Sequence, residues 1–166
     1  RLLNQPELPR TLAHKLEVWF AASGSIGLEI TESALIRDLE QTVEVLTELK
    51  RLGFALAIDD FGTGYSSLNY LREIPVDRLK IDQSYVQNIK SNRGDDVIIQ
   101  AIIAMAKSLN LDVLAEGVET QDQLDFLRKQ NCGEVQGFLF SKPITAPECE
   151  KLMREYALKK ASEDVK

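Results

Sequence analysis

Residues 55–67 read ALAIDDFGTGYSS, a short apolar run that leads into two adjacent acids, Asp59 and Asp60, and then into a loop with two glycines. Side chains of neighbouring strand residues point to opposite faces of a sheet. Two adjacent acids therefore converge on one site where the strand gives way to a loop, and Gly62 and Gly64 permit that sharp exit. Like charges this close repel unless a cation or a proton separates them. The stretch predicts either a divalent metal shared by the aspartates or an ordinary turn with a helix-capping acid.

The overall composition indicates a single folded domain and argues against one class of partner, the polymeric nucleic acids. The chain has 166 residues, 44% of them apolar, which is enough for one domain with a proper core. Lys and Arg number 20 against 26 Asp and Glu, a net charge of -6, so we do not expect a polymeric nucleic acid as partner. A small phosphorylated ligand stays possible, because a bound metal supplies positive charge locally.

The apolar runs and the cysteines predict a cytoplasmic domain without membrane contact. The longest apolar runs are far shorter than a membrane span. Cys132 and Cys149 follow no paired metal-ligand spacing, and nothing at the start of the chain resembles a signal peptide. We therefore interpret both cysteines as free thiols.

Short β-rich runs alternate with longer runs of helical period, a pattern typical of a parallel sheet wrapped by helices. The predicted strands are largely apolar, as strands covered on both faces are; they span Ile26–Thr31, Ala55–Asp60, Arg78–Asp82, Asp112–Val118 and Glu134–Phe140. Apolar spacings of three and four predict the helices between them; these span Leu8–Ala22, Leu39–Leu52, Tyr65–Arg72, Asp95–Leu109, Thr120–Gln130 and Ala146–Leu158.

Polar residues gather at one end of every predicted strand, and this favours a barrel over an open sheet. In a (β/α) barrel the carboxyl ends of the strands form the active face. The polar residues there are Glu29, Asp59, Asp60, Lys80, Asp82, Glu116, Glu119 and Gln136. The predicted fold class is therefore α/β, a TIM-like (β/α) barrel. A full barrel has eight strands, so five strand-helix units leave it incomplete at the N-terminus. We expect a fragment of a longer protein or a neighbouring copy that closes the gap.

The first and third predicted strands carry three of these polar side chains. Glu29 lies between Leu28 and Ile30, so its carboxylate faces the side opposite to theirs. It is either a cation ligand in the mouth of the barrel or a salt-bridged structural residue. Lys80 and Asp82 share one face by the period of two. They either form a plain ion pair or keep the lysine charged near a phosphate.

Further candidates lie just beyond the strands. Glu32 follows the first strand and is better placed to hold a loop by hydrogen bonding than to reach the same metal. Glu116 and Glu119 bracket a stretch in which Gly117 lets a ligand approach the backbone closely. Thr120 is a candidate helix cap, and one of the two glutamates could complete that capping arrangement.

Taken together, the acids, one lysine and one amide at the same end of successive strands suit metal-assisted phosphodiester hydrolysis. Gln136 is the amide, and it either hydrogen-bonds a substrate or metal ligand or serves the structure alone. His14 lies far in sequence from these strands and fits a surface position better than a catalytic base. The pair Ser66-Ser67 has no histidine near it in sequence, which argues against a serine hydrolase.

Five motifs resemble one known family, the EAL-domain cyclic di-GMP phosphodiesterases, over nearly the whole chain. They are LEITES at 28–33, DDFGTGYSSLNYL at 59–71, PVDRLKID at 75–82, LAEGVET at 114–120 and EVQGFLFSKP at 134–143. The resemblance implies a TIM-like barrel that converts cyclic di-GMP to linear pGpG in bacterial signalling, with Mg²⁺ or Mn²⁺ and two ions per site.

The resemblance also implies a role for each matching residue. The implied metal ligands are Glu29, Asp59, Asp60 and Glu116, and the implied catalytic residues are Lys80, Glu116 and Asp60. Gln136, Glu119 and Gly117 are implied to support the substrate or the metal site, and Glu32 to anchor the loop at residues 61–67.

Features expected of the family also lie outside this sequence. The Glu-Ala-Leu motif and a following strand with an asparagine ligand would precede position 1. The resemblance further implies a homodimer and upstream sensory or cyclase domains. We expect residues 1–158 to form the domain and residues 159–166 a charged tail. The alternatives to an enzyme are a catalytically inactive cyclic di-GMP receptor, favoured if the leading ligands are lost, and a regulatory interaction domain.

Overall fold

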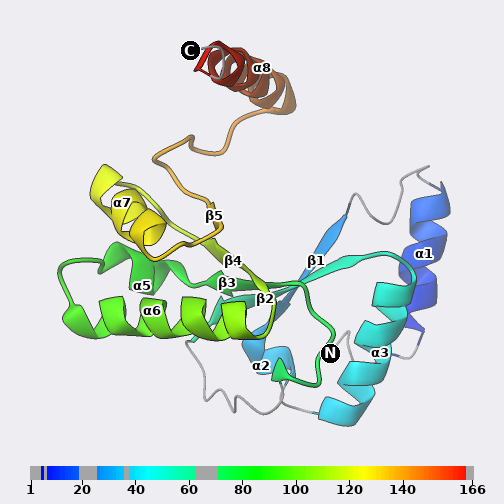
Figure 1. Ribbon diagram of the computed structural model, residues 1–166. Helices are drawn as coiled ribbons and strands as arrows, with labels where there is room; N and C mark the ends of the chain where they lie inside the picture. The colour runs from blue at the N-terminus through cyan, green and yellow to red at the C-terminus, as the bar shows by residue number, and fades with distance from the viewer. Residues whose placement is uncertain (1–4, 6, 19–25, 36–37, 63–70, 164–166) are drawn as a thin grey trace.

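The computed structural model describes residues 5, 7–18, 26–35, 38–62 and 71–163, and it places a twisted parallel sheet at the centre (Figure 1). The described residues form five strands in the spatial order β1-β2-β3-β4-β5, every neighbouring pair parallel. The strands are β1 (Gly27–Thr31), β2 (Ala55–Phe61), β3 (Arg78–Ile81), β4 (Asp112–Ala115) and β5 (Glu134–Val135). Spatial order thus follows chain order, as the alternating sequence pattern predicts.

Helices precede, connect and follow the strands, and several of them pack on one face of the sheet. They are α1 (Leu8–Val18), α2 (Glu32–Leu35), α3 (Leu39–Arg51), α5 (Gln83–Gln87), α6 (Arg93–Ser108), α7 (Gln121–Lys129) and α8 (Ala146–Glu163). Helix α3 contacts β2 and α1, and α6 contacts β3 and β4. No helix within the described ranges is both long and apolar enough to cross a membrane.

The core lies between the helices and one face of the sheet. Ile58, Leu79 and Val113 are register partners on neighbouring strands and are all buried. Alternate strand residues face the other side, where Ala57 on β2 and Glu29 on β1 are register partners. Burial of the apolar face stabilises the sheet, and the opposite face is left to carry polar side chains.

Local sequence sets several helix ends. Asp38 caps α3 by accepting a hydrogen bond from the backbone of Gln41, and Asn92 caps α6 in the same way. The predicted cap at Thr120 is confirmed, because its side chain accepts from the backbone of Gln123. Gln123, and not a glutamate, completes this capping box.

The last two strands are shorter than the sequence predicts. Strand β4 ends at Ala115 instead of Val118, and β5 ends at Val135 instead of Phe140. Gly117 has a φ of +71°, so the chain turns away from the sheet immediately after β4. The backbone continues to make hydrogen bonds there, such as Val118 N–H to Gln136 C=O at 3.0 Å, but without strand regularity.

The helices also differ from prediction at several points. The short helices α2 and α5 are additional, since four or five residues are too few to show a helical period. The predicted helix at 65–72 falls almost entirely on residues outside the described ranges, as do residues 19–22 of the predicted first helix. Helix α8 continues to Glu163, past the predicted boundary at 158, and stands apart from the sheet (Figure 1).

Candidate functional site

A bulge in β2 brings the two adjacent aspartates to one side of the sheet. Ile58 pairs with Leu79 and Phe61 pairs with Ile81, so two residues of β2, Asp59 and Asp60, lie opposite the single residue Lys80 of β3. Asp60 has a φ of 54°, in the left-handed region. The sequence predicts that the two acids converge where the strand ends. Both lie in the last three residues of β2, and the extra residue of the bulge changes the alternation of side chains there.

Lys80 occupies the centre of an acidic cluster. Its Nζ lies 2.7 Å from Glu29 Oε2, 2.9 Å from Asp59 Oδ1 and 2.8 Å from Glu116 Oε1. The lysine side chain is 5% exposed. Strands β1, β2 and β3 and the first residue after β4 thus each contribute one charged group. Asp82 does not join them as a Lys80 partner; it caps α5 and lies beside Asp60.

The charges of this cluster shift two pKa values. Burial lowers the pKa of Lys80, but the contacts with Glu116, Glu29 and Asp59 outweigh burial and raise that pKa above its usual range. Burial, followed by repulsion from Asp59, raises the pKa of Asp60. The lysine is therefore firmly charged, and the carboxylates around it still repel one another.

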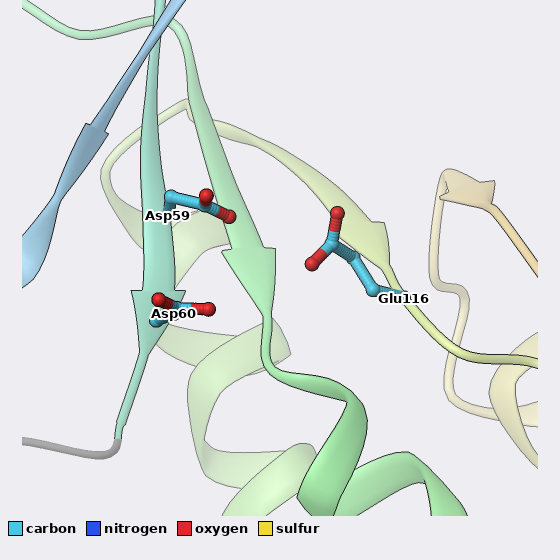
Figure 2. Close-up of side chains that lie close together, drawn as sticks. All are labelled: Asp59, Asp60 and Glu116. Carbon is cyan, nitrogen blue, oxygen red and sulfur yellow. The ribbon is translucent and has the colours of Figure 1, made fainter.

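Three carboxylates are close enough to share a metal ion. Oxygen atoms of Asp59, Asp60 and Glu116 all lie within 4.8 Å of one another. Figure 2 shows the carboxylates of Asp59 and Glu116 directed toward each other from β2 and from the end of β4, with Asp60 next to them. Such an all-oxygen donor set suits a hard divalent cation.

Lys80 alone does not balance the carboxylates around it. The buried Oδ1 of Asp59 lies 2.9 Å from Lys80 Nζ, and the same ammonium group also contacts Glu29 and Glu116. One positive charge shared by three carboxylates leaves an excess of negative charge that a further cation would relieve. The residues present therefore fit a divalent metal.

Glu32 contacts the residue that follows β2. It is 2% exposed, and its Oε2 accepts a hydrogen bond from the backbone N–H of Gly62 at 3.0 Å. Its predicted role as a loop anchor concerns residues 61–67, of which only Phe61 and Gly62 are described.

A pocket of about 190 Å³ adjoins the acidic cluster, lined by Gln83, Glu116, Gly117, Glu119, Gln136 and Phe138 among others. Glu119 and Gln136 are exposed there. The close neighbour of Gly117 is Gln83: a Cβ on Gly117 would lie 2.6 Å from Gln83 Cβ. The close approach of a ligand to Gly117 stays a prediction.

Sequence reasoning missed two residues that shape this end of the sheet. Gly137 packs directly on the backbone of Val118, where an added Cβ would lie 2.1 Å from the carbonyl oxygen. Tyr85 donates a hydrogen bond from its hydroxyl to the carbonyl of Gly62. The glycine beside Gln136 was a visible signal for the first, whereas the five-residue helix that carries Tyr85 has no periodicity to mark it.

Comparison with known proteins gives a consistent result. A family model described as "EAL domain" matches residues 1–143. The curated protein "Cyclic di-GMP phosphodiesterase NbdA" of Pseudomonas aeruginosa is 48% identical over 154 residues, which are 93% of this chain and 20% of that protein. The "Bifunctional diguanylate cyclase/cyclic di-GMP phosphodiesterase MucR" of the same organism is 44% identical over 119 residues, 72% of this chain and 17% of that protein. The chain thus spans about a fifth of these relatives.

Solved structures agree with the predicted fold. The phosphodiesterase PaMucR in complex with c-di-GMP has a TM-score of 0.85 at 36% identity, over 89% of this chain and 60% of that one. The EAL domain of Mycobacterium smegmatis DcpA has a TM-score of 0.83 at 43% identity, over 91% and 68%. A manganese and cyclic di-GMP complex of Klebsiella pneumoniae BlrP1 has a TM-score of 0.76 at 33% identity, over 86% and 36%. These likenesses confirm the α/β class and the TIM-like barrel architecture.

Proposed function

The chain belongs to the EAL domain family, and from that premise we propose that it hydrolyses cyclic di-GMP to linear pGpG with the help of a divalent metal. The observation that carries this proposal is the acidic cluster around Lys80, with oxygens of Asp59, Asp60 and Glu116 within 4.8 Å of one another. Relatives named as cyclic di-GMP phosphodiesterases support the substrate.

The metal ligands in this proposal come from β1, from β2 and from the residue that follows β4. Asp59, Asp60 and Glu116 would hold the ion, and Glu29, 2.7 Å from Lys80 Nζ, would provide further coordination. When bound, Mg²⁺ or Mn²⁺ supplies Lewis acidity toward a phosphate oxygen and a more acidic bound water. The manganese complex of BlrP1 supports this class of ion. We propose two ions per site, since more carboxylates converge here than one ion requires.

The reaction adds one water across one phosphodiester. The water oxygen forms a bond to phosphorus, the bond from phosphorus to the ribose 3′ oxygen breaks, and that oxygen receives a proton. The surrounding carboxylates raise the pKa of Lys80 and favour its protonated form. In that form it can donate hydrogen bonds to the attacking water or to a phosphate oxygen. Its contacts with three carboxylates fix the position of the ammonium group.

The adjoining pocket is the proposed place for part of the substrate. Gln136 and Glu119 are exposed on its wall, so their side chains are available to a ligand. A carboxylate accepts and an amide both donates and accepts hydrogen bonds, which suits the edges of a guanine base or a ribose.

Further proposals concern the whole protein. Because the chain spans about a fifth of its curated relatives, we propose that it acts together with sensory or cyclase domains in a longer cytoplasmic protein. We also propose that the domain works as a homodimer.

The test is a product assay on the 166-residue chain. Purified protein is incubated with cyclic di-GMP and Mn²⁺ or Mg²⁺, and pGpG is followed by chromatography. We expect metal-dependent product from the wild type and from Asp125→Asn, an exposed acid on α7 that serves as control, and none from Asp60→Asn. Binding of cyclic di-GMP without product would refute hydrolysis by this chain and favour the receptor alternative.

A further inference from the structure

The backbone around Asp60 adopts a conformation that this residue does not favour by itself. Asp60 has a φ of 54° and Gly62 a φ of +98°. Glycine enters this region without steric cost, whereas an aspartate there needs support from its surroundings. Phe61 between them is 3% exposed and therefore anchored in the core. Asp60 lies beside Asp82, and the contacts that hold Gly62 at the exit of β2 act on the same turn.

Both polar groups of Gly62 are held by side chains from other elements. Its N–H donates to Glu32 Oε2 at 3.0 Å, and its carbonyl oxygen accepts from the hydroxyl of Tyr85. Glu32 begins α2 and Tyr85 lies in α5, so side chains from two helices hold Gly62 by hydrogen bonds. Both hydrogen bonds are partly buried, so water replaces them less easily than it would at the surface.

The ring of Tyr85 also packs against Gly62. A Cβ on Gly62 would lie 3.2 Å from Tyr85 Cε2 and 3.3 Å from Ile102 Cδ1, so no larger residue fits there without a shift. Burial, followed by the nearby charges of Asp95, Asp82 and Glu32, raises the pKa of Tyr85. Its hydroxyl therefore keeps its proton and acts as a donor to the carbonyl.

We propose that Tyr85 is a positioning residue for Asp60. Its hydroxyl and the carboxylate of Glu32 together fix Gly62, and this holds Asp60 in the left-handed conformation that turns its carboxylate toward Asp59 and Glu116. Tyr85 is not among the proposed metal ligands; it contacts Gly62 and acts through the backbone at the end of β2. The inference rests on the proposed metal site and adds a residue to its support.

The experiment removes one oxygen atom and measures metal affinity directly. Tyr85→Phe keeps the ring and loses the hydroxyl, and Tyr156→Phe makes the same chemical change at an exposed position of α8. The dissociation constant for Mn²⁺ is measured on the full chain from the electron paramagnetic resonance signal of the free ion. We expect Tyr85→Phe to bind Mn²⁺ about fivefold more weakly, within the range that one net hydrogen bond allows. Tyr156→Phe should match the wild type.

A second readout separates positioning from general destabilisation. Amide hydrogen exchange at Gly62 should accelerate in Tyr85→Phe, while the melting temperature and exchange in the core strands stay close to the wild type. An unchanged Mn²⁺ affinity would overturn the proposal. So would a weaker affinity accompanied by faster exchange throughout the sheet, because that pattern describes a loosened fold.

The proposed hydrolysis and the role of Tyr85 fail in distinguishable ways. A wild type that binds Mn²⁺ and releases no pGpG refutes hydrolysis, while the comparison of Mn²⁺ affinities still decides the role of Tyr85. A wild type that hydrolyses cyclic di-GMP beside a Tyr85→Phe variant of equal Mn²⁺ affinity refutes Tyr85 alone. If both proposals hold, excess Mn²⁺ restores the hydrolysis rate of Tyr85→Phe.

Discussion

The two ends of the parallel sheet use charged side chains in different proportions. At the amino ends of the strands, each of two cations pairs with one carboxylate: Lys50 lies 2.6 Å from Asp77, and Arg78 lies 2.5 Å from Glu134. At the carboxyl ends, Lys80 contacts three carboxylates at once, with Asp60 beside them.

This difference distinguishes ion pairs that only stabilise the fold from charged groups that are available to bind a metal. Matched and partly exposed pairs contribute modestly to stability and need nothing else. An excess of carboxylates around one buried lysine leaves repulsion that a bound cation relieves. We therefore expect changes at the amino ends to alter stability alone, and changes at the carboxyl ends to alter stability, metal binding and activity together.

The largest effect is expected from removing the cation at the carboxyl ends. Lys80→Met leaves three carboxylates without a counter-charge, and we expect the free energy of unfolding to fall by about 3 kcal/mol, as for breaking a buried ion pair. Hydrolysis of cyclic di-GMP should be lost as well. Urea unfolding and the product assay measure the two effects.

Lys50→Met is the matched change at the amino ends. Its side chain is 34% exposed, so solvent screens the pair and the loss should stay at about 1 kcal/mol or less, with activity kept. Equal losses from the two variants would contradict the contrast between the two ends.

The next effect comes from adding the metal. Mn²⁺ at about a hundred times its dissociation constant should raise the free energy of unfolding of the wild type by about 2.7 kcal/mol, because it binds the folded state. The gain should shrink strongly in Asp60→Asn and persist in Asp77→Asn, which lies at the other end of the sheet. Thermal unfolding with Mn²⁺ and with a chelator gives the comparison. Similar gains in both variants would place the metal elsewhere.

A glycine lies before β5 and another lies after it, so substitutions of these two glycines also compare the two ends of the sheet. At Gly137, after the strand, an added Cβ would overlap the backbone of Val118, and we expect Gly137→Ala to cost about 2 kcal/mol. At Gly133, before the strand, the nearest atom is the carbonyl oxygen of Val113 at 3.7 Å, so Gly133→Ala should be nearly neutral. Chemical unfolding of both variants checks this, and a neutral Gly137→Ala would show that the loop moves freely.

The smallest effect concerns pH at the amino ends. Burial raises the pKa of Asp77, but the hydrogen bonds from Lys50 and from the backbone of Leu56 outweigh it, so the pKa is lowered overall. Because the folded-state pKa lies below the unfolded one, the stabilisation is fully present above the unfolded pKa. It is lost as pH falls through the folded pKa.

Asp77→Asn should therefore be less stable than the wild type by up to about 1 kcal/mol at neutral pH, a value reduced by the exposure of the side chain. The difference should vanish at strongly acidic pH. Urea unfolding of the two proteins from pH 7 downward gives the curve. A difference that is constant with pH would assign the effect to packing instead of charge.

Much of the architecture could be predicted from the sequence because it depends on local pattern. Apolar runs ending in Asp59, Lys80 and Glu116 mark parallel strands, and the carboxyl ends of such strands meet at one edge. The bulge could not be predicted in this way. It is a mismatch in register between β2 and β3, and register depends on both strands at once.

The sequence by itself determined the order of strands and helices, the cap at Thr120 and the gathering of acids at one edge, because periodicity, capping and chain direction are properties of short segments. Only the tertiary structure decided that Asp59 and Asp60 both lie opposite Lys80. The same holds for the hydrogen bond from Tyr85 to Gly62 and for the packing of Gly137 on the backbone of Val118. These contacts join segments distant in the chain. Their geometry follows from how the strands and helices pack, and no local pattern encodes it.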